Sequence, residues 1–170
     1  MPMSARGYSR LDSSSALQRL GLSWILLCLA LATHVADEAA TGFLAVYNPT
    51  VLALKQQLGY WPMPTFEFRG WLTGLIVAIL ILLALTPFVF DGSRWIRPLF
   101  YVFALLMIAN ALGHTAGTIF GRTVSSLHFP RPMPGFYSSP LMFAASVYGL
   151  VQLRRTRIPS GVEPDLSHSR

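Results

Sequence analysis

The feature that most limits how this chain can fold is a long apolar segment in its middle. No charged residue lies between Arg69 and Asp91, and most positions there are Leu, Ile, Val, Ala or Phe. A helix of that length and composition can cross a bilayer. The whole chain agrees, because 53% of its residues are hydrophobic and only 12% are charged. This composition excludes an ordinary soluble domain and predicts an integral membrane protein.

Three further apolar runs predict three further spans. The four expected helices run from Leu17 to Tyr47, from Phe68 to Phe90, from Pro98 to a loop near Arg122, and from Phe136 to Leu153. Residues 48–69 contain three prolines and a short amphipathic fragment. This pattern predicts a loop with a short helix on the membrane surface. The predicted fold is all-α, an integral membrane four-helix bundle with an outer-side amphipathic segment between spans 1 and 2.

The two ends of the chain have no apolar periodicity. We expect residues 1–15 to be a disordered leader, residues 16–157 to form the four-span membrane domain, and residues 158–170 to be a disordered tail. The basic start and short apolar run also allow a cleavable signal peptide. Residues 33–36 (Thr-His-Val-Ala) form a poor cleavage site for one, which favours the membrane helix.

The net charge of +6 raises the possibility of nucleic-acid binding, but the basic residues flank the apolar runs and form no single patch. Basic residues concentrate in cytoplasmic loops of membrane proteins. Four spans put both ends of the chain on one side, so the arginines predict that both termini are cytoplasmic. The arginines on that side are Arg6, Arg10, Arg19, Arg94, Arg97, Arg154, Arg155 and Arg157.

Two groups of polar residues interrupt the apolar helices. His34, Asp37 and Glu38 share one face of the first helix, and Asn110 and His114 share one face of the third. At about 1.5 Å per residue, His34 lies roughly 22 Å beyond Arg19, and His114 lies roughly 25 Å beyond Arg97. The two groups therefore lie at similar depth in helices that run in the same direction. Ionisable residues at such depth indicate a functional site.

Two kinds of chemistry fit these residues. His34, Glu38 and His114 match the three-ligand pattern of a catalytic zinc site, with Asp37 as general base or water-orienting group and Asn110 as a hydrogen-bond donor. Without a metal, the same residues could perform acid/base chemistry, since two neighbouring carboxylates do not easily both ionise. The sequence leaves both possibilities open: a site with zinc or another divalent metal, and a site without a metal.

Each of these residues also has a plainer interpretation. His34 could mark the exit of the helix into water, with both carboxylates solvated, and His114 could be a packing residue bonded to Asn110. We expect Ser138 and Ser139 to cap the last helix rather than to supply a nucleophile. Glu67 fits an interfacial partner of Arg69 or a cap, whereas His128 and His168 fit ordinary loop and tail residues.

Small residues repeat every fourth position on the third helix. Gly113, Gly117 and Gly121 have the spacing that lets membrane helices approach closely, which suggests a homo-oligomer. Cys28 is the one cysteine, so no intrachain disulfide is possible.

These motifs resemble a known family. The segment from His34 to Glu38 resembles the signature of the HXXEE family of small multi-span membrane proteins, and Asn110 with His114 resembles its second polar motif. Pro134 and Gly135 resemble the end of a third motif, although Pro132 stands where that motif has tyrosine. Asp37 also replaces the first glutamate of the signature. The family has no settled activity, so the resemblance implies a shared polar site without naming a reaction.

The sequence therefore predicts a membrane-embedded enzyme that acts on a lipid or isoprenoid-like substrate. The reaction is either hydrolase-like with a metal or isomerase- or cyclase-like without one. Intramembrane histidines and carboxylates also form proton relays, so a proton-coupled small carrier is one alternative. A non-catalytic membrane subunit that binds a partner through its glycine-rich helix is the other.

Overall fold

The computed structural model describes residues 5–123, 128–129 and 131–156. Six α-helices provide the regular structure, and no β-strand occurs within these ranges. The prediction of an all-α fold is therefore confirmed. The tail expected at residues 158–170 lies outside the described residues, as do residues 1–4 of the expected leader.

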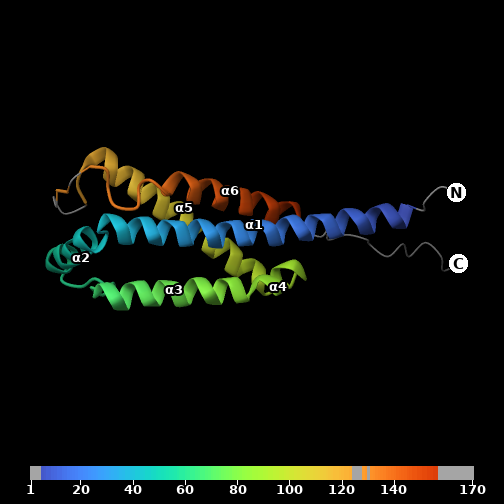
Figure 1. Ribbon diagram of the computed structural model, residues 1–170, viewed down its shortest axis with the longest axis horizontal. Helices are drawn as coiled ribbons and strands as arrows, with labels where there is room; N and C mark the ends of the chain where they lie inside the picture. Colours follow the sequence, from blue (N-terminus) through green and yellow to red (C-terminus); the bar gives the residue numbers. More distant parts are fainter. Residues whose placement is uncertain (1–4, 124–127, 130, 157–170) are drawn as a thin grey trace, which may run out of the picture.

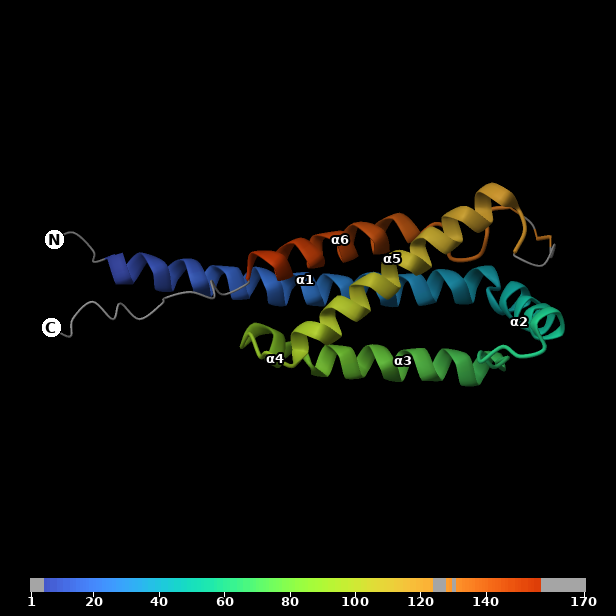
Figure 2. The ribbon, with the colours of Figure 1, turned by 180° about the vertical axis from the view of Figure 1, so that it is seen from behind.

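One helix, α1 (Ala5–Thr41), runs through the molecule as its axis (Figure 1). It begins at Ala5, so the prediction of a leader without regular structure is wrong for residues 5–15. On one side of α1 lies α6 (Ser139–Arg155), on the other lie α3 (Phe68–Ala84) and α4 (Thr86–Phe90), and α5 (Ile96–Phe120) runs obliquely from the second side to the first. Seen from behind, α5 crosses α1 on its way from α4 to the opposite end (Figure 2).

The first helix ends earlier than its lack of proline predicts. It stops at Thr41 because Gly42 adopts a left-handed conformation (φ 76°), a common way to end a helix. The chain then enters α2 (Leu44–Leu58) after only Gly42 and Phe43. The short helix expected within residues 48–69 is present but longer than predicted, because α2 begins at Leu44 and continues across Pro49. A proline inside a helix removes one backbone hydrogen bond, and α2 tolerates this loss.

Polar contacts attach α2 to the chain segment that follows it. The Asn48 amide donates to the Phe66 carbonyl at 2.9 Å and accepts from the Phe66 N–H at 3.0 Å. The Tyr47 hydroxyl donates to the Pro64 carbonyl at 3.1 Å, and burial raises the pKa of this hydroxyl, which keeps it a neutral donor. These bonds make α2 and residues 64–66 one unit.

Proline also divides the second apolar segment. The helix expected from Phe68 to Phe90 breaks at Leu85 into α3 and α4, because Pro87 lacks an N–H and its ring crowds the carbonyl four residues earlier, at Leu83. The third and fourth apolar helices are close to their expected positions, as α5 and α6.

The core of the bundle is built around Trp24. This side chain is fully buried, its ring centroid lies 5.0 Å from that of Phe100 and 5.5 Å from that of Phe103, and its indole N–H donates to the Leu82 carbonyl at 2.9 Å. It therefore joins α1 to α5 by packing and to α3 by a hydrogen bond. These contacts of Trp24 fix how α1 is rotated about its own axis.

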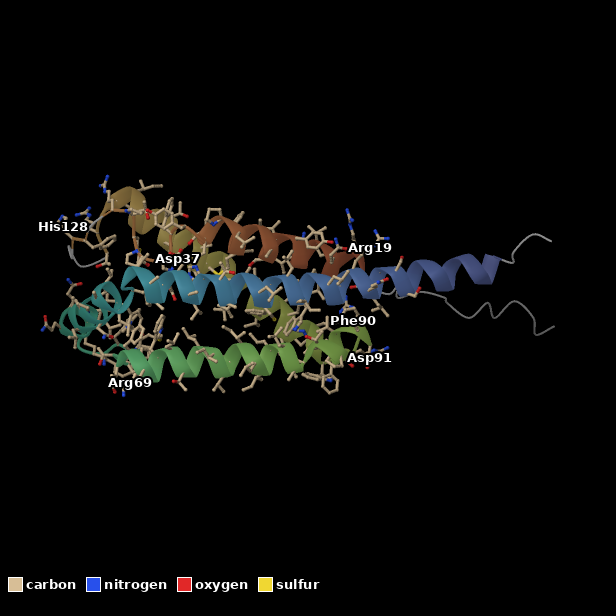
Figure 3. All side chains as sticks on the ribbon, viewed as in Figure 1. Arg19, Asp37, Arg69, Phe90, Asp91 and His128 are labelled. Atoms are coloured by element: carbon tan, nitrogen blue, oxygen red, sulfur yellow. The ribbon has the colours of Figure 1, made fainter. Side chains whose placement is uncertain are left out.

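The ends of the bundle differ in the residues that they carry. Arg19 and Asp91 lie near one end, whereas Arg69 and His128 lie near the other, and Asp37 is closer to the second (Figure 3). The polar residues of the first helix therefore lie away from the end marked by Arg19, as the residue counts predict.

Candidate metal centre

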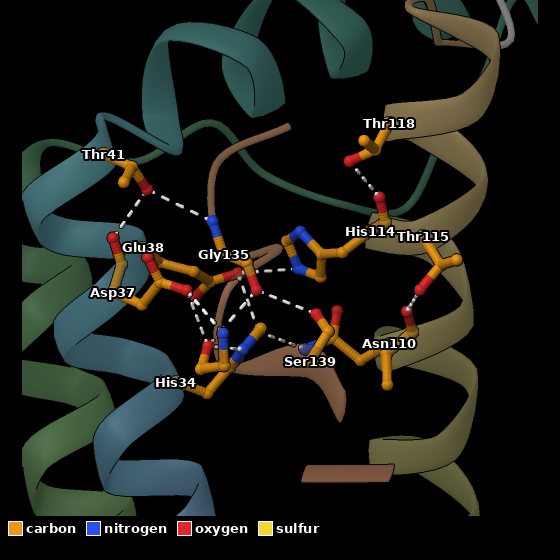
Figure 4. Close-up of polar contacts among 12 residues, drawn as sticks. His34, Asp37, Glu38, Thr41, Asn110, His114, Thr115, Thr118, Gly135 and Ser139 are labelled. Carbon is orange, nitrogen blue, oxygen red and sulfur yellow. Dashed lines mark hydrogen bonds and ion pairs between the residues drawn. The ribbon is translucent and has the colours of Figure 1, made fainter. Parts of the chain in front are cut away.

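The two histidines predicted to face each other do meet. The ring centroids of His34 on α1 and His114 on α5 lie 4.7 Å apart, with their planes at 76° (Figure 4). Their exposed fractions are 1% and 2%. The interpretation of His34 as the point where the helix enters water is therefore wrong.

Glu38 links the two rings. Its Oε1 atom lies 3.4 Å from Nε2 of His34 and 3.1 Å from Nε2 of His114, and the residue is 5% exposed. His34 and Glu38 are one helical turn apart, so both side chains leave α1 on the face toward α5. One ligand atom from each of the three residues lies within 4.8 Å of the others. We call these three residues the His/Glu/His cluster.

The spacing of these atoms fits a metal ion. Zinc bonds of about 2.0–2.2 Å in a tetrahedral site separate neighbouring ligand atoms by roughly 3.3–3.6 Å. The two separations in the cluster, 3.4 and 3.1 Å, are close to that range. The His/Glu/His cluster could therefore hold a metal ion, with three protein ligands and a further position free for another group.

A second layer of hydrogen bonds orients His34. Ser138 Oγ lies 2.8 Å from Nδ1 of His34, 2.8 Å from Oδ2 of Asp37 and 3.2 Å from the Gly135 carbonyl. Both oxygen partners are acceptors, so the single hydroxyl proton points toward one of them and Ser138 must accept from His34. His34 therefore carries its proton on Nδ1 and presents a lone pair at Nε2.

Asn110 agrees with that assignment. Its side-chain nitrogen donates to Nε2 of His34 at 3.1 Å, which requires a lone pair on that ring nitrogen. The same lone pair faces the Glu38 carboxylate oxygen at 3.4 Å. Two acceptors at that distance repel each other unless a cation or a shared proton lies between them. The cluster is thus built for positive charge.

Asp37 has a different place from the one expected for a general base. Its Oδ2 atom accepts from the backbone N–H of Ser138 at 2.9 Å as well as from the Ser138 hydroxyl. It lies outside the His/Glu/His cluster and acts on His34 through Ser138. A carboxylate at this point also stabilises the N-terminus of α6.

Gly135 closes the site on the side of the loop before α6. Its φ is 83°, and a Cβ atom there would lie 2.8 Å from Cε1 of His114 and 2.9 Å from Cγ of Glu38. Glycine is therefore required both by the backbone conformation and by the space. The Gly135 N–H donates to the Thr41 hydroxyl at 3.2 Å, which ties the loop to α1.

The remaining sequence predictions have mixed outcomes. Ser138 occupies the N-cap position of α6, but its side chain makes no capping bond and serves the site instead. Glu67 at the start of α3 and His128 in the loop are exposed and outside the cluster. His168 lies outside the described residues. Cys28 is a free, buried cysteine, as the cysteine count requires.

The glycine repeat on α5 packs partly within the chain itself. A Cβ atom at Gly117 would meet Met133, and one at Gly121 would meet Arg131. Gly113 alone of the three has open space next to its Cα. The close approach that two of these glycines permit is therefore intramolecular, and the homo-oligomer stays a prediction.

Taken together, the fold and site define a helical protein with a buried His/Glu/His cluster that can accept a cation. Comparison with family models, with curated proteins and with solved structures finds no match for this chain. Membership of the HXXEE family therefore stays a prediction that rests on its motifs.

Proposed function

We propose that this chain is a four-span membrane protein with a catalytic metal site. Two helical segments, residues 14–41 and 96–120, are long and apolar enough to cross a membrane. The most apolar part of the first segment is 56% buried in the fold, and that of α5 only 28%. The apolar core helix of a soluble protein would be mostly buried, so this exposure supports a lipid environment.

The other two spans in this proposal are α3 with α4, and α6. The α3 and α6 helices have 17 residues each, or about 25 Å, which is near the lower limit for a span. Large apolar side chains are exposed on all four long helices, among them Leu29, Leu80, Leu106 and Val147. The arginine distribution supports placing both termini in the cytoplasm.

Within this fold we assign the chain as a metal-dependent enzyme that acts on a lipophilic substrate by hydrolase-like chemistry. The single observation that carries this proposal is the convergence of Nε2 of His34, Oε1 of Glu38 and Nε2 of His114 within 4.8 Å in the buried part of the bundle. Two histidines and one glutamate are also the ligand set of several catalytic zinc sites.

In this proposal His34, Glu38 and His114 hold the ion. A divalent ion such as zinc supplies Lewis acidity toward a carbonyl group and activates water as a nucleophile. Asp37 and Ser138 keep the proton of His34 on Nδ1, so that Nε2 has a lone pair that would bind the ion in place of the Asn110 N–H. The Asn110 amide is positioned to donate a hydrogen bond at the cluster.

One observation favours a second candidate, which is acid/base isomerisation or cyclisation without a metal. Nδ1 of His114 is buried and has no hydrogen-bond partner among the described residues. If Nε2 of His114 carries the proton and donates to Glu38, Nδ1 holds only a lone pair, which is less costly to bury alone than an N–H group. A metal on Nε2 would instead leave an N–H there without an acceptor.

Metal analysis of the purified protein distinguishes the two. We expect about one zinc per chain in the wild type and in His128→Ala, whose histidine is exposed and outside the cluster. His34→Ala, His114→Ala and Glu38→Gln should lose it. Equal and negligible metal in all five proteins would overturn the metal-dependent function and leave the acid/base candidate.

A further inference from the structure

A cavity of about 820 Å³ lies against the His/Glu/His cluster, between α2 and α5. That volume is within the range of small-molecule sites, about 300–1,000 Å³. His114 and Asn110 line it, and both contact other residues of the site: His114 touches Glu38, and Asn110 touches His34. A molecule in this cavity would therefore lie beside the cluster.

The walls of the cavity are mainly apolar. They include Phe43, Val46 and Leu54 from the α2 side and Phe120 from α5, with Trp61 and Met133 from the loops. Phe43 also lies against the site, since its ring centroid is 5.7 Å from that of His114. A ligand that fills a cavity with such walls must be largely hydrocarbon, because polar groups buried there would lose their hydrogen bonds to water.

Among the residues that the structure describes, one charged side chain lines the cavity, and it lies at the end away from the cluster. Phe120 is about 9 Å further along the α5 axis than His114, and Arg122 follows two residues later. Arg122 is exposed and forms no ion pair with any residue that the structure describes. An exposed guanidinium group without such an ion pair can bind a carboxylate or a phosphate through two parallel hydrogen bonds.

From this arrangement we infer that the cavity binds a single-chain amphiphile with an anionic head group. The head group pairs with Arg122, the hydrocarbon chain lies along the aromatic wall, and the chain reaches His114 and Asn110. The inference names the substrate class of the proposed enzyme, whose hydrolysable carbonyl group would lie on the chain beside His114 and away from the head group. It rests on that function only for the statement that the ligand reacts. Binding itself depends on the cavity and on Arg122.

Tryptophan quenching tests this binding. The wild-type chain in nanodiscs of zwitterionic lipid is titrated with dibromostearate, dibromostearyl phosphate and the neutral dibromostearyl alcohol. Bromine on the chain quenches Trp61 at the cavity wall. We expect saturable quenching by both anions, with about tenfold weaker binding of the alcohol. Trp61→Phe should remove the saturable part. The carboxylate and the phosphate, titrated separately, show which head group the site prefers.

Arg122→Gln supplies the decisive comparison, with Arg69→Gln as the control. Arg69 is exposed at the same end of the bundle but does not line the cavity. Arg122→Gln should weaken binding of the anions about tenfold, leave the alcohol unchanged and thereby show that the cavity is intact. Equal binding of anion and alcohol by the wild type, or unchanged anion binding by Arg122→Gln, would overturn the inference.

The same titration of His34→Ala separates this inference from the proposed function. We expect anion binding close to that of the wild type although the variant holds no metal. If none of these proteins holds metal but anion binding is saturable, the metal-dependent function is overturned and the binding site is supported. If the wild type holds metal but anion binding is not saturable, the binding site is overturned and the metal-dependent function is supported.

Discussion

Ser138 Oγ lies 2.8 Å from Nδ1 of His34, although the two residues are 104 positions apart in the chain. Because Ser138 also contacts Asp37 at 2.8 Å, a half-buried carboxylate orients the histidine through one hydroxyl group. Ser138→Ala should leave Nδ1 of His34 without an acceptor and weaken zinc binding about ten- to a hundredfold, as expected for loss of such a partner. Competition with a fluorescent zinc chelator measures this change.

Ser139→Ala is the matched control for that variant. The Ser139 hydroxyl is also buried, but it donates to the Gly135 carbonyl at 2.8 Å and does not contact His34. We expect its zinc affinity to stay within about threefold of the wild type. Equal losses in the two variants would show that Ser138 acts through the loop and not through the imidazole.

Gly135→Ala should damage the His/Glu/His cluster. The added methyl group would meet both His114 and Glu38, and the left-handed backbone conformation would itself cost about 1–2 kcal/mol. We therefore expect a lower Tm together with loss of bound metal. Gly59→Ala has a similar φ of 70° with nothing within 4 Å of the new carbon, so it should lower Tm slightly and keep the metal. Full metal content in Gly135→Ala would contradict the tight packing of this glycine.

Trp24→Phe should destabilise the bundle. The change removes the indole hydrogen bond to the Leu82 carbonyl and leaves a cavity between α1 and α5, which together cost about 2–3 kcal/mol. Thermal unfolding followed by intrinsic fluorescence measures the effect as a lower Tm. Trp95→Phe is the control, because that side chain is 53% exposed and should change stability by less than about 0.5 kcal/mol. Similar Tm values for the two variants would argue against Trp24 as the centre of the core.

The four-span topology predicts opposite labelling of two surface positions. Asp91 and Tyr60 are both exposed, and they lie at opposite ends of α3 and α4. In intact cells Tyr60→Cys should react with a membrane-impermeant maleimide, whereas Asp91→Cys should react only after lysis. The native Cys28 is fully buried and adds little background. Labelling of Asp91→Cys in intact cells would contradict cytoplasmic termini.

The meeting of His34 with Glu38 and His114 could be predicted because it depends on regular geometry. A helix has a fixed rise and turn, so residue counts from Arg19 and Arg97 give the depth of each side chain, and the spacing of four gives a shared face. The structure confirms the contact between the two imidazoles.

The different roles of Asp37 and Glu38 could not be predicted in this way. Both carboxylates lie on the polar face of α1, and the rotation of the helix decides which one points at α5 and which at α6. Packing around Trp24 sets that rotation, and it depends on side chains far apart in the sequence. The hydroxyl that joins Asp37 to His34 comes from a residue whose position fits a helix cap equally well.

The break after Thr41 could have been found, because glycine is a strong signal for the end of a helix. Pro49 is a weaker signal for a helix end, since one proline removes a single backbone hydrogen bond and α2 continues past it.

The two-residue link of Gly42 and Phe43 has a mechanical consequence. It is the direct covalent connection between the helix that carries His34 and the helix that forms one wall of the cavity, and Phe43 itself rests on the His114 ring. Since hydrogen bonds between Asn48 and Phe66 tie α2 to the segment after it, an outward swing of this unit about Gly42 would pull the phenyl ring off the imidazole. Widening the cavity and uncovering His114 are therefore one hinge motion.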